Sequence, residues 1–251
     1  MLEAIDFSAG EAVAAALVLF VASYVRGLTG FGFSAVFVAG ATFFIEPSSA
    51  VPLALMYEVV ASVFQAPGVR SEIRWRTLAI LAGAAVVGNP VGLAILSAAE
   101  PDVLRAVVYA TLLVLTLLLV RSAAGSIEPS TVILFGVGVV AGVVNGATAL
   151  SGLVLVVAMS FMTVTTFELR ATLVAYFFVS NLFAVSVLAG RGDLSEVDLS
   201  RATAGLPVLA LGVAVGSRTF RGLDPAAFRR VTVFVLIALA SAGMARLGIG
   251  A

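Results

Sequence analysis

Long apolar segments, separated by breaks of only a few residues, fill this chain of 251 residues. A helix needs about 20 apolar residues to cross a bilayer, so the length allows at most about ten crossings. Ten segments can be marked, with boundaries good to a few residues: 9–26, 29–45, 48–68, 76–98, 102–121, 130–146, 148–164, 169–190, 199–219 and 226–248. They predict an all-α, polytopic transmembrane helical bundle with almost no soluble part.

Composition supports this interpretation and removes several classes of function. Hydrophobic residues make up 61% of the chain and charged residues 11%, whereas a soluble domain carries roughly 25% charge. Histidine and cysteine are absent, so we predict no metal site and no cofactor. The net charge is zero and does not suggest a nucleic acid partner. Without any lysine the chain has no phosphate-binding loop for ATP.

The two halves of the chain look alike. Gly27–Gly30 has a counterpart in Gly146–Ala149, and Pro101–Arg105 has one in Pro225–Arg229. Because the offset stays at about 120 residues, the matches together indicate an internal duplication. The repeats would cover residues 1–125 and 126–251.

The number of crossings in each repeat decides how the repeats are related. Five crossings, or three if the glycine-rich pairs are re-entrant, would invert the second repeat, as is common in secondary transporters. Four crossings would leave the repeats parallel. We expect inversion, with glycine-rich broken or re-entrant helices, but the sequence leaves both arrangements open.

Arginines predict the orientation in the membrane. With an odd count, one face collects Arg26, Arg70, Arg74, Arg76, Arg121, Arg170, Arg218 and Arg221, and the other Arg105, Arg191, Arg201 and Arg246. The richer face should be cytoplasmic, which puts both termini outside. We expect a multi-pass protein of a cell inner membrane.

The first glycine-rich stretch, residues 26–34, is the most informative part of the sequence. Gly27, Gly30 and Gly32 each cost about 1 kcal/mol in a helix interior relative to alanine. A broken helix is tolerated in a membrane only where protein or water satisfies the freed backbone groups. It also offers free N–H groups that favour anions. Close helix packing, which also selects small residues, stays open as the alternative.

The second stretch, residues 142–152, repeats the theme and adds side-chain donors at Asn145, Thr148 and Ser151. Several convergent donors in a dry pocket are what an oxyanion needs. Hydroxyls bonded to their own helices are the alternative for each side chain. The predicted substrate-binding residues are Arg26, Gly27, Thr29, Gly30, Phe31, Gly32, Ser34, Asn145, Gly146, Thr148, Ser151 and Gly152.

Two charged residues have two interpretations each. Arg26 would be a substrate ligand with a fixed charge and parallel donors, or a cytoplasmic anchor. Glu58 lies near the middle of a segment, where a carboxylate is expensive and points to function. It is a candidate for proton coupling, or a structural hydrogen-bonding group.

Further polar groups lie in mid-segment. Tyr57, Asn89 and Asn181 are candidates to line a cavity. Asn89 precedes Pro90, which predicts a kink. Interhelical hydrogen bonding is the expected role of Asn181 and Gln65.

On these residues the sequence resembles the sulfite exporter TauE/SafE family, also called the toluene sulfonate uptake permease family. The resemblance rests on Val25–Ser34, on Pro47–Leu53, on the motif Asn145–Gly152 and on the duplicated layout. The second motif departs from the family pattern, because Ser151-Gly152-Leu153 replaces a Gly-Gly-Pro. The resemblance implies transport of sulfite, sulfoacetate, thiosulfate or taurine-related compounds, with seven to nine spans.

We therefore expect a secondary transporter of small sulfur-containing oxyanions or organosulfonates, working by alternating access. An anion channel with a similar site and a non-transporting scaffold subunit are the alternatives. An enzyme is not expected, because intramembrane hydrolases need paired acids or a histidine. The expected partners are the small anion and membrane lipid, and association into a homo-oligomer is left open.

Overall fold

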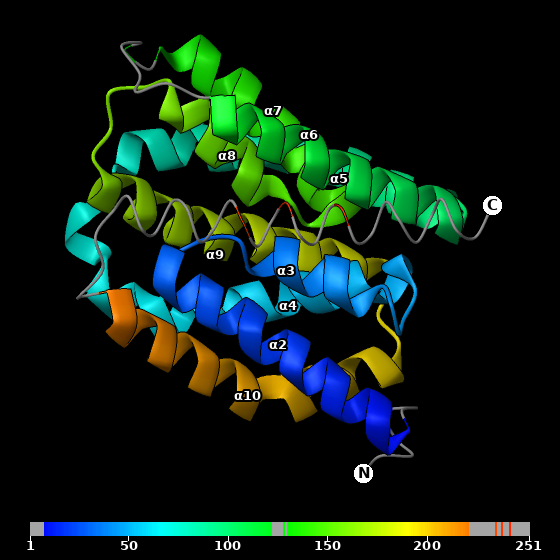
Figure 1. Ribbon diagram of the computed structural model, residues 1–251. Coiled ribbons are helices and arrows are strands. Elements are labelled where there is room, and N and C mark those ends of the chain that lie inside the picture. The colour runs from blue at the N-terminus through cyan, green and yellow to red at the C-terminus, as the bar shows by residue number, and fades with distance from the viewer. Residues whose placement is uncertain are drawn as a thin grey trace.

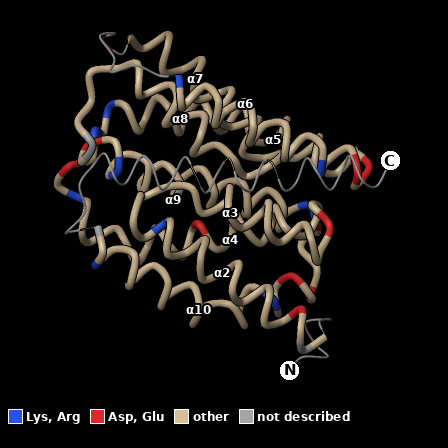
Figure 2. Tube along the Cα trace, viewed as in Figure 1, with Lys and Arg blue, Asp and Glu red and all other residues tan. Residues whose placement is uncertain are grey.

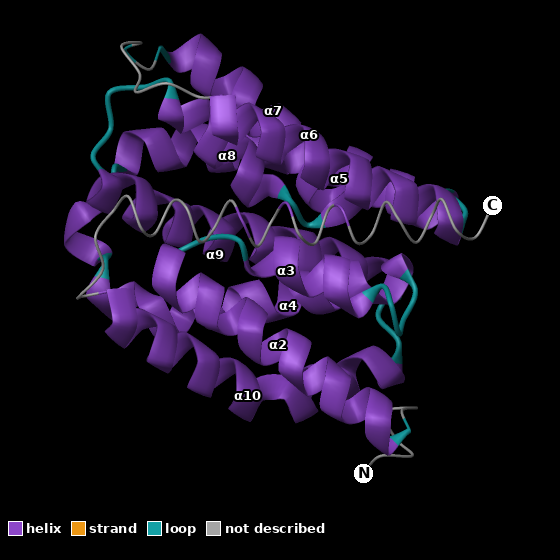
Figure 3. Cartoon of the chain, in the orientation of Figure 1, coloured by secondary structure: helices purple, strands orange, loops and turns teal. Residues whose placement is uncertain are grey.

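Every regular element in the described part of this computed structural model is a helix (Figures 1 and 3). The structure describes residues 8–121, 128 and 130–220, and the single positions 234, 237 and 241. The helices are α2 (Ala9–Thr29), α3 (Phe33–Ala41), α4 (Pro47–Gln65), α5 (Trp75–Ala98), α6 (Pro101–Arg121), α7 (Thr131–Thr148), α8 (Ser151–Ser160), α9 (Thr166–Arg191) and α10 (Glu196–Phe220). Two 3-10 turns, η1 (Ala66–Gly68) and η2 (Arg70–Glu72), join α4 to α5. The predicted all-α transmembrane class is confirmed.

Seven of the described helices are long and apolar enough to cross a membrane: α2, α4 with η1, α5, α6, α7, α9 and α10. The segments 29–45 and 148–164 instead form α3 and α8, of 9 and 10 residues. At 1.5 Å per residue such helices reach about half of a hydrocarbon core about 30 Å thick. Apolar composition could not reveal this, because a short buried helix is as apolar as a spanning one. The segment 226–248 lies almost wholly outside the described residues.

Local sequence explains where several helices begin. Ser8 and Thr165 each accept a hydrogen bond from the backbone of a glutamate three residues on, and that glutamate bonds back to the cap residue. This reciprocal pair satisfies two amides that a helix start leaves free. Pro47 begins α4, in the position where its missing N–H costs nothing.

Two helix pairs pack through glycine, and each pair runs in parallel. A Cβ added to Gly27 of α2 would meet the backbone of Val213 and Ser217 in α10. A Cβ added to Gly146 of α7 would meet the backbone of Asn89 and Leu93 in α5. Small residues let helix backbones approach this closely in membranes. The packing interpretation therefore holds for these two glycines.

Contacts along the chain fix the directions of the helices. α5 runs parallel to α9, because Arg74 contacts Glu168 near their starts and Asn89 contacts Ser180 further along. α10 turns back after α9 through residues 192–195. α2 runs parallel to α10, and α7 runs parallel to α5. Therefore α2 and α7 run in opposite directions.

The helices form three layers (Figure 1). α3, α4 and α9 lie between the α2–α10 pair and a group made of α5, α6, α7 and α8. Counting the short α3 and α8, the first and fourth described helices of one half thus pair with the fourth and first of the other. This pairing favours an inverted duplication, which stays a prediction.

Candidate functional site

Both glycine-rich stretches break their helices, as predicted. Gly30 caps the end of α2 and Gly32 caps the start of α3, and both glycines have φ near +80°. α7 ends at Ala149, which has φ of 60° and is the one non-glycine residue with positive φ in the described part of the chain. An L-residue in this conformation costs about 1 kcal/mol or more. Strain of this kind persists where the surrounding structure requires it.

At each break a threonine hydroxyl accepts a hydrogen bond from the backbone amide two residues on. The Thr29 hydroxyl donates to the Phe31 carbonyl and accepts from the Phe31 amide at 2.9 Å. The Thr148 hydroxyl donates to the Val144 carbonyl at 2.8 Å and accepts from the Leu150 amide at 3.3 Å. Each hydroxyl therefore stabilises the turn between the two helices of its own break. This is local hydrogen bonding of a hydroxyl to nearby backbone.

The starts of α3 and α8 meet at one small cavity. Its volume is about 10 Å³, roughly the space of one water molecule. It is lined by Gly32, Ser34, Ala35, Glu58, Ala149, Leu150, Gly152, Leu153 and Phe177. Neither helix has a side-chain hydrogen bond at its cap. A helix start leaves backbone amides without an acceptor within the helix, and Ser34 and Gly152, in the first turns of α3 and α8, bring two such starts to a single hollow.

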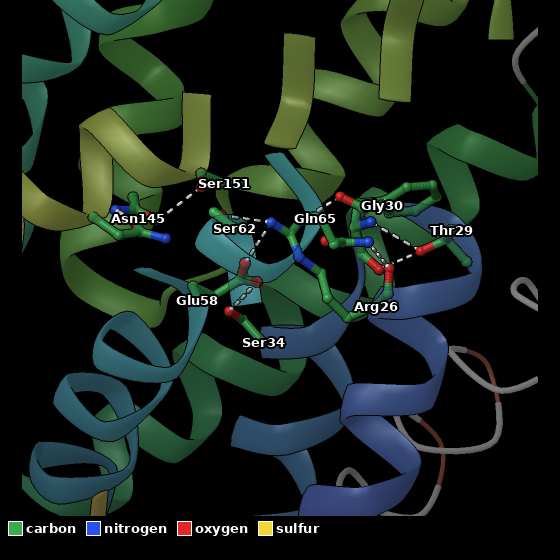
Figure 4. A network of polar contacts seen from close by, with 11 residues as sticks. Arg26, Thr29, Gly30, Ser34, Glu58, Ser62, Gln65, Asn145 and Ser151 are labelled. Carbon is green, nitrogen blue, oxygen red and sulfur yellow. Dashed lines mark hydrogen bonds and ion pairs between the residues drawn. The ribbon is translucent and has the colours of Figure 1, made fainter. Parts of the chain in front are cut away.

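Arg26, in the last turn of α2, is fully buried beside this cavity (Figure 4). Its Nη2 donates to the Ser62 hydroxyl at 2.8 Å and lies 3.3 Å from Glu58 Oε2. Its Nη1 donates to the Gly30 carbonyl. The guanidinium carbon lies 4.4 Å from the centre of the Phe177 ring, where a cation is attracted by the ring face. With no exposed surface, Arg26 cannot be an interfacial anchor, so that alternative is wrong.

Glu58 is the counter-ion of Arg26. The carboxylate is buried on α4, and the Ser34 hydroxyl at the start of α3 donates to its Oε1 at 3.0 Å. Arg26 Nε has no hydrogen-bond partner, and Glu58 Oε2 has only the ion pair. A buried pair with unused bonding capacity is costly, and it leaves a donor for a ligand.

Residues 15–243 match the family described as sulfite exporter TauE/SafE. The chain belongs to this family. No curated protein and no solved structure matches it. Membership makes the protein a membrane transporter of sulfur anions such as sulfite rather than an enzyme. Nearly all described helices fall inside the matched range, so both breaks and the Arg26–Glu58 pair are part of the family's region.

An amide cluster supports the second break of this family member. Asn145 Nδ2 donates to Asn89 Oδ1 at 3.1 Å and to Asn181 Oδ1 at 2.8 Å. The Ser151 hydroxyl donates to Asn145 Oδ1 at 2.7 Å. Asn89 in turn donates to the Ser180 hydroxyl at 3.0 Å. The cluster ties α8 to α5, α7 and α9, and it confirms the predicted interhelical bonding of Asn181.

The predicted binding residues fall into three groups. Gly32, Ser34 and Gly152 line the cavity, and Arg26 contacts its Glu58 and Phe177 walls. A second group shapes the breaks or supports them: Thr29, Gly30, Phe31, Asn145, Thr148 and Ser151. Gly27 and Gly146 are the third group and lie at helix contacts. Direct contact with a substrate stays a prediction for all of them.

Other polar predictions can also be placed. Gln65 Nε2 donates to the Arg26 carbonyl at 3.1 Å, which confirms its interhelical role. Tyr57 packs with Phe33 and Phe37, and its hydroxyl donates to the Arg201 carbonyl at 2.7 Å. α5 continues as a helix through Pro90.

Sequence reasoning missed three residues of the site. Ser62 lies one turn after Glu58, and that spacing could have indicated a shared face. Phe177 carries no signal in an apolar segment. Arg170 was assigned only to a charged face, yet its Nη2 donates to the Gly27 carbonyl at 2.7 Å and its side chain packs on Gly30. It thus caps the end of α2, where a cation is favoured by the helix dipole.

Proposed function

We propose that this protein carries a small sulfur oxyanion such as sulfite across a cell inner membrane, and that the anion binds between the two helix breaks. One observation supports this most strongly: two uncapped helix starts line one cavity, and the buried Arg26 contacts the Glu58 and Phe177 side chains of its wall. The oxygens of a sulfo group accept several charge-assisted hydrogen bonds at once. Sulfoacetate, thiosulfate and related sulfonates present the same group.

The size of the cavity favours a carrier. At about 10 Å³ it is far too small for sulfite, so binding requires the helices around it to move apart. Since the two breaks belong to different halves of the chain, movement of one half against the other would open the cavity. Alternating access of this kind is common in transporters built from inverted repeats.

A groove near the small cavity suggests an access route. It holds about 130 Å³ between α2, α3, α4 and α10, at the end where α2 begins. Phe37 and Tyr57 line this groove. Ser34, one turn before Phe37, and Glu58, next to Tyr57, line the cavity. We infer that the aromatic side chains and the Tyr57–Arg201 bond form the closed gate between them.

Glu58 supplies the coupling in this proposal. In the absence of substrate its carboxylate is the anion that Arg26 and the start of α3 bind. A substrate anion would compete for the same donors. Protonation of Glu58 would end that competition, so a proton would travel with the anion or precede it.

Exchange of labelled sulfite across proteoliposomes tests the function. We expect saturable exchange for the unaltered protein, and none above background for the double variant Arg26→Gln/Glu58→Gln, in which both charges are removed together. Charge-assisted hydrogen bonds contribute about 1.5–3 kcal/mol each, so losing two should weaken binding by about 100-fold or more.

Arg105→Gln is the matched control, because Arg105 pairs with the exposed Asp102 at a helix end. It should exchange sulfite normally. Saturable exchange by the double variant at the rate of the unaltered protein would refute the site. Ion conductance far above carrier turnover would show a channel.

A further inference from the structure

Trp75, the chain's single tryptophan, lies between two hollows at the start of α5. The larger is an apolar groove of about 670 Å³ formed by the end of α4, the turns η1 and η2, α5 and α9. Its walls include Val63, Pro67, Leu78 and Phe178. A groove of this volume with apolar walls fits a hydrocarbon chain.

The second hollow is more polar than the groove and shares Trp75 with it. It holds about 350 Å³, and Arg74, Arg76 and Thr131 line it together with Trp75. Arg74 is paired with Glu168 at 3.0 Å. Arg76 and Arg70, which lines the groove, are exposed and form no ion pair within the part of the chain that the structure describes. Two unpaired cations therefore flank Trp75.

The charge around this site is complementary to an anion. Figure 2 shows arginines gathered where α5 begins and acidic residues at the opposite end of the bundle. The arginine-rich end carries Arg70, Arg74, Arg76, Arg121, Arg170 and Arg218 against Glu72, Glu128 and Glu168. The positive-inside rule puts such an end in the cytoplasm, where the leaflet carries anionic lipid.

We propose that an anionic phospholipid binds at Trp75. One acyl chain lies in the apolar groove, the phosphate lies between Arg70 and Arg76, and the exposed indole of Trp75 (60% exposed) sits at headgroup level, where tryptophan is enriched. The site is independent of the transported anion. It does touch the transport machinery, because Ser62 lines the groove and also binds Arg26.

Intrinsic fluorescence tests the proposal on the unaltered chain, since Trp75 is the single source of tryptophan emission. The protein is reconstituted in phosphatidylcholine vesicles that contain either brominated phosphatidylglycerol or brominated phosphatidylcholine at the same low fraction. At this fraction we expect the brominated phosphatidylglycerol to quench Trp75 strongly and the brominated phosphatidylcholine to quench it weakly. The variant Arg70→Gln/Arg76→Gln should lose this preference, by about fivefold for each arginine.

Arg121→Gln is the matched control, because it removes the same charge at the same end of the bundle. It should keep the preference for phosphatidylglycerol. Equal quenching by the two brominated lipids in the unaltered protein would overturn the proposal. The proposal would also be overturned if Arg121→Gln reduced the preference for phosphatidylglycerol as much, per charge removed, as the double variant does. The preference would then reflect surface potential alone.

Discussion

At the scale of single residues, the site depends on a charge pair that the sequence could not reveal. Arg26 and Glu58 were each singled out, one by its glycine-rich neighbours and one by its depth in an apolar segment. Nothing in the sequence says that α4 folds back to bring Glu58 Oε2 within 3.3 Å of Arg26 Nη2. The hydroxyls of Thr29 and Thr148 show the opposite case. Their bonding within the breaks follows from local geometry, which sequence reasoning did consider.

Glu58→Gln should change how sulfite binding depends on pH. Glutamine keeps the shape but cannot carry the charge that competes with the substrate for Arg26. Binding to the unaltered protein should weaken as pH rises and Glu58 ionises, relative to the variant at the same pH. Thermal stabilisation of the purified protein by sulfite measures this, and the ratio between the two proteins cancels the titration of sulfite itself.

The variant should also be less stable without ligand. It leaves Arg26 buried without its counter-ion, which costs about 3–5 kcal/mol, so sulfite should stabilise it more than it stabilises the unaltered protein. Glu100→Gln, a change at an exposed position, serves as the control. A pH profile for Glu58→Gln that matches that of the unaltered protein would exclude Glu58 from coupling.

At the scale of helices, glycine has two separate uses here. Gly30 and Gly32 have positive φ and make the first break, whereas Gly27 and Gly146 press against a neighbouring backbone. Sequence spacing predicted that glycines would serve both uses, but not which glycine serves which use. The reason is physical: a turn needs a local conformation, but close packing needs a partner helix far away in the chain.

Gly146→Ala should destabilise the protein through the α5–α7 contact. The added methyl group would overlap the backbone of Asn89 and Leu93, and overpacking of this kind costs about 1–3 kcal/mol. Gly136→Ala, in the same helix, meets nothing within 4 Å and should be neutral or stabilising by up to about 1 kcal/mol. Thermal unfolding in detergent compares the two. Equal unfolding temperatures would mean that the helices do not pack through Gly146.

At the scale of the whole molecule, the packing of the helices brings the starts of α3 and α8, which follow the two breaks, to one cavity. The sequence predicted the membrane-helical class and the location of the breaks, because both follow from hydrophobicity and glycine content. It could not predict that the starts of α3 and α8 share a cavity with Glu58 and Phe177, since that depends on how the long helices pack. Composition alone also could not predict the number of membrane crossings.

Selenite gives the most direct measurement of the central claim, that one anion is bound between the two breaks. Selenium in this sulfite analogue can be located by anomalous diffraction from crystals of the protein. We expect a peak within hydrogen-bonding reach of Arg26 and the starts of α3 and α8, near Ser34 and Gly152. A selenium peak elsewhere in the molecule, or none in crystals of protein that exchanges selenite in vesicles, would contradict the claim.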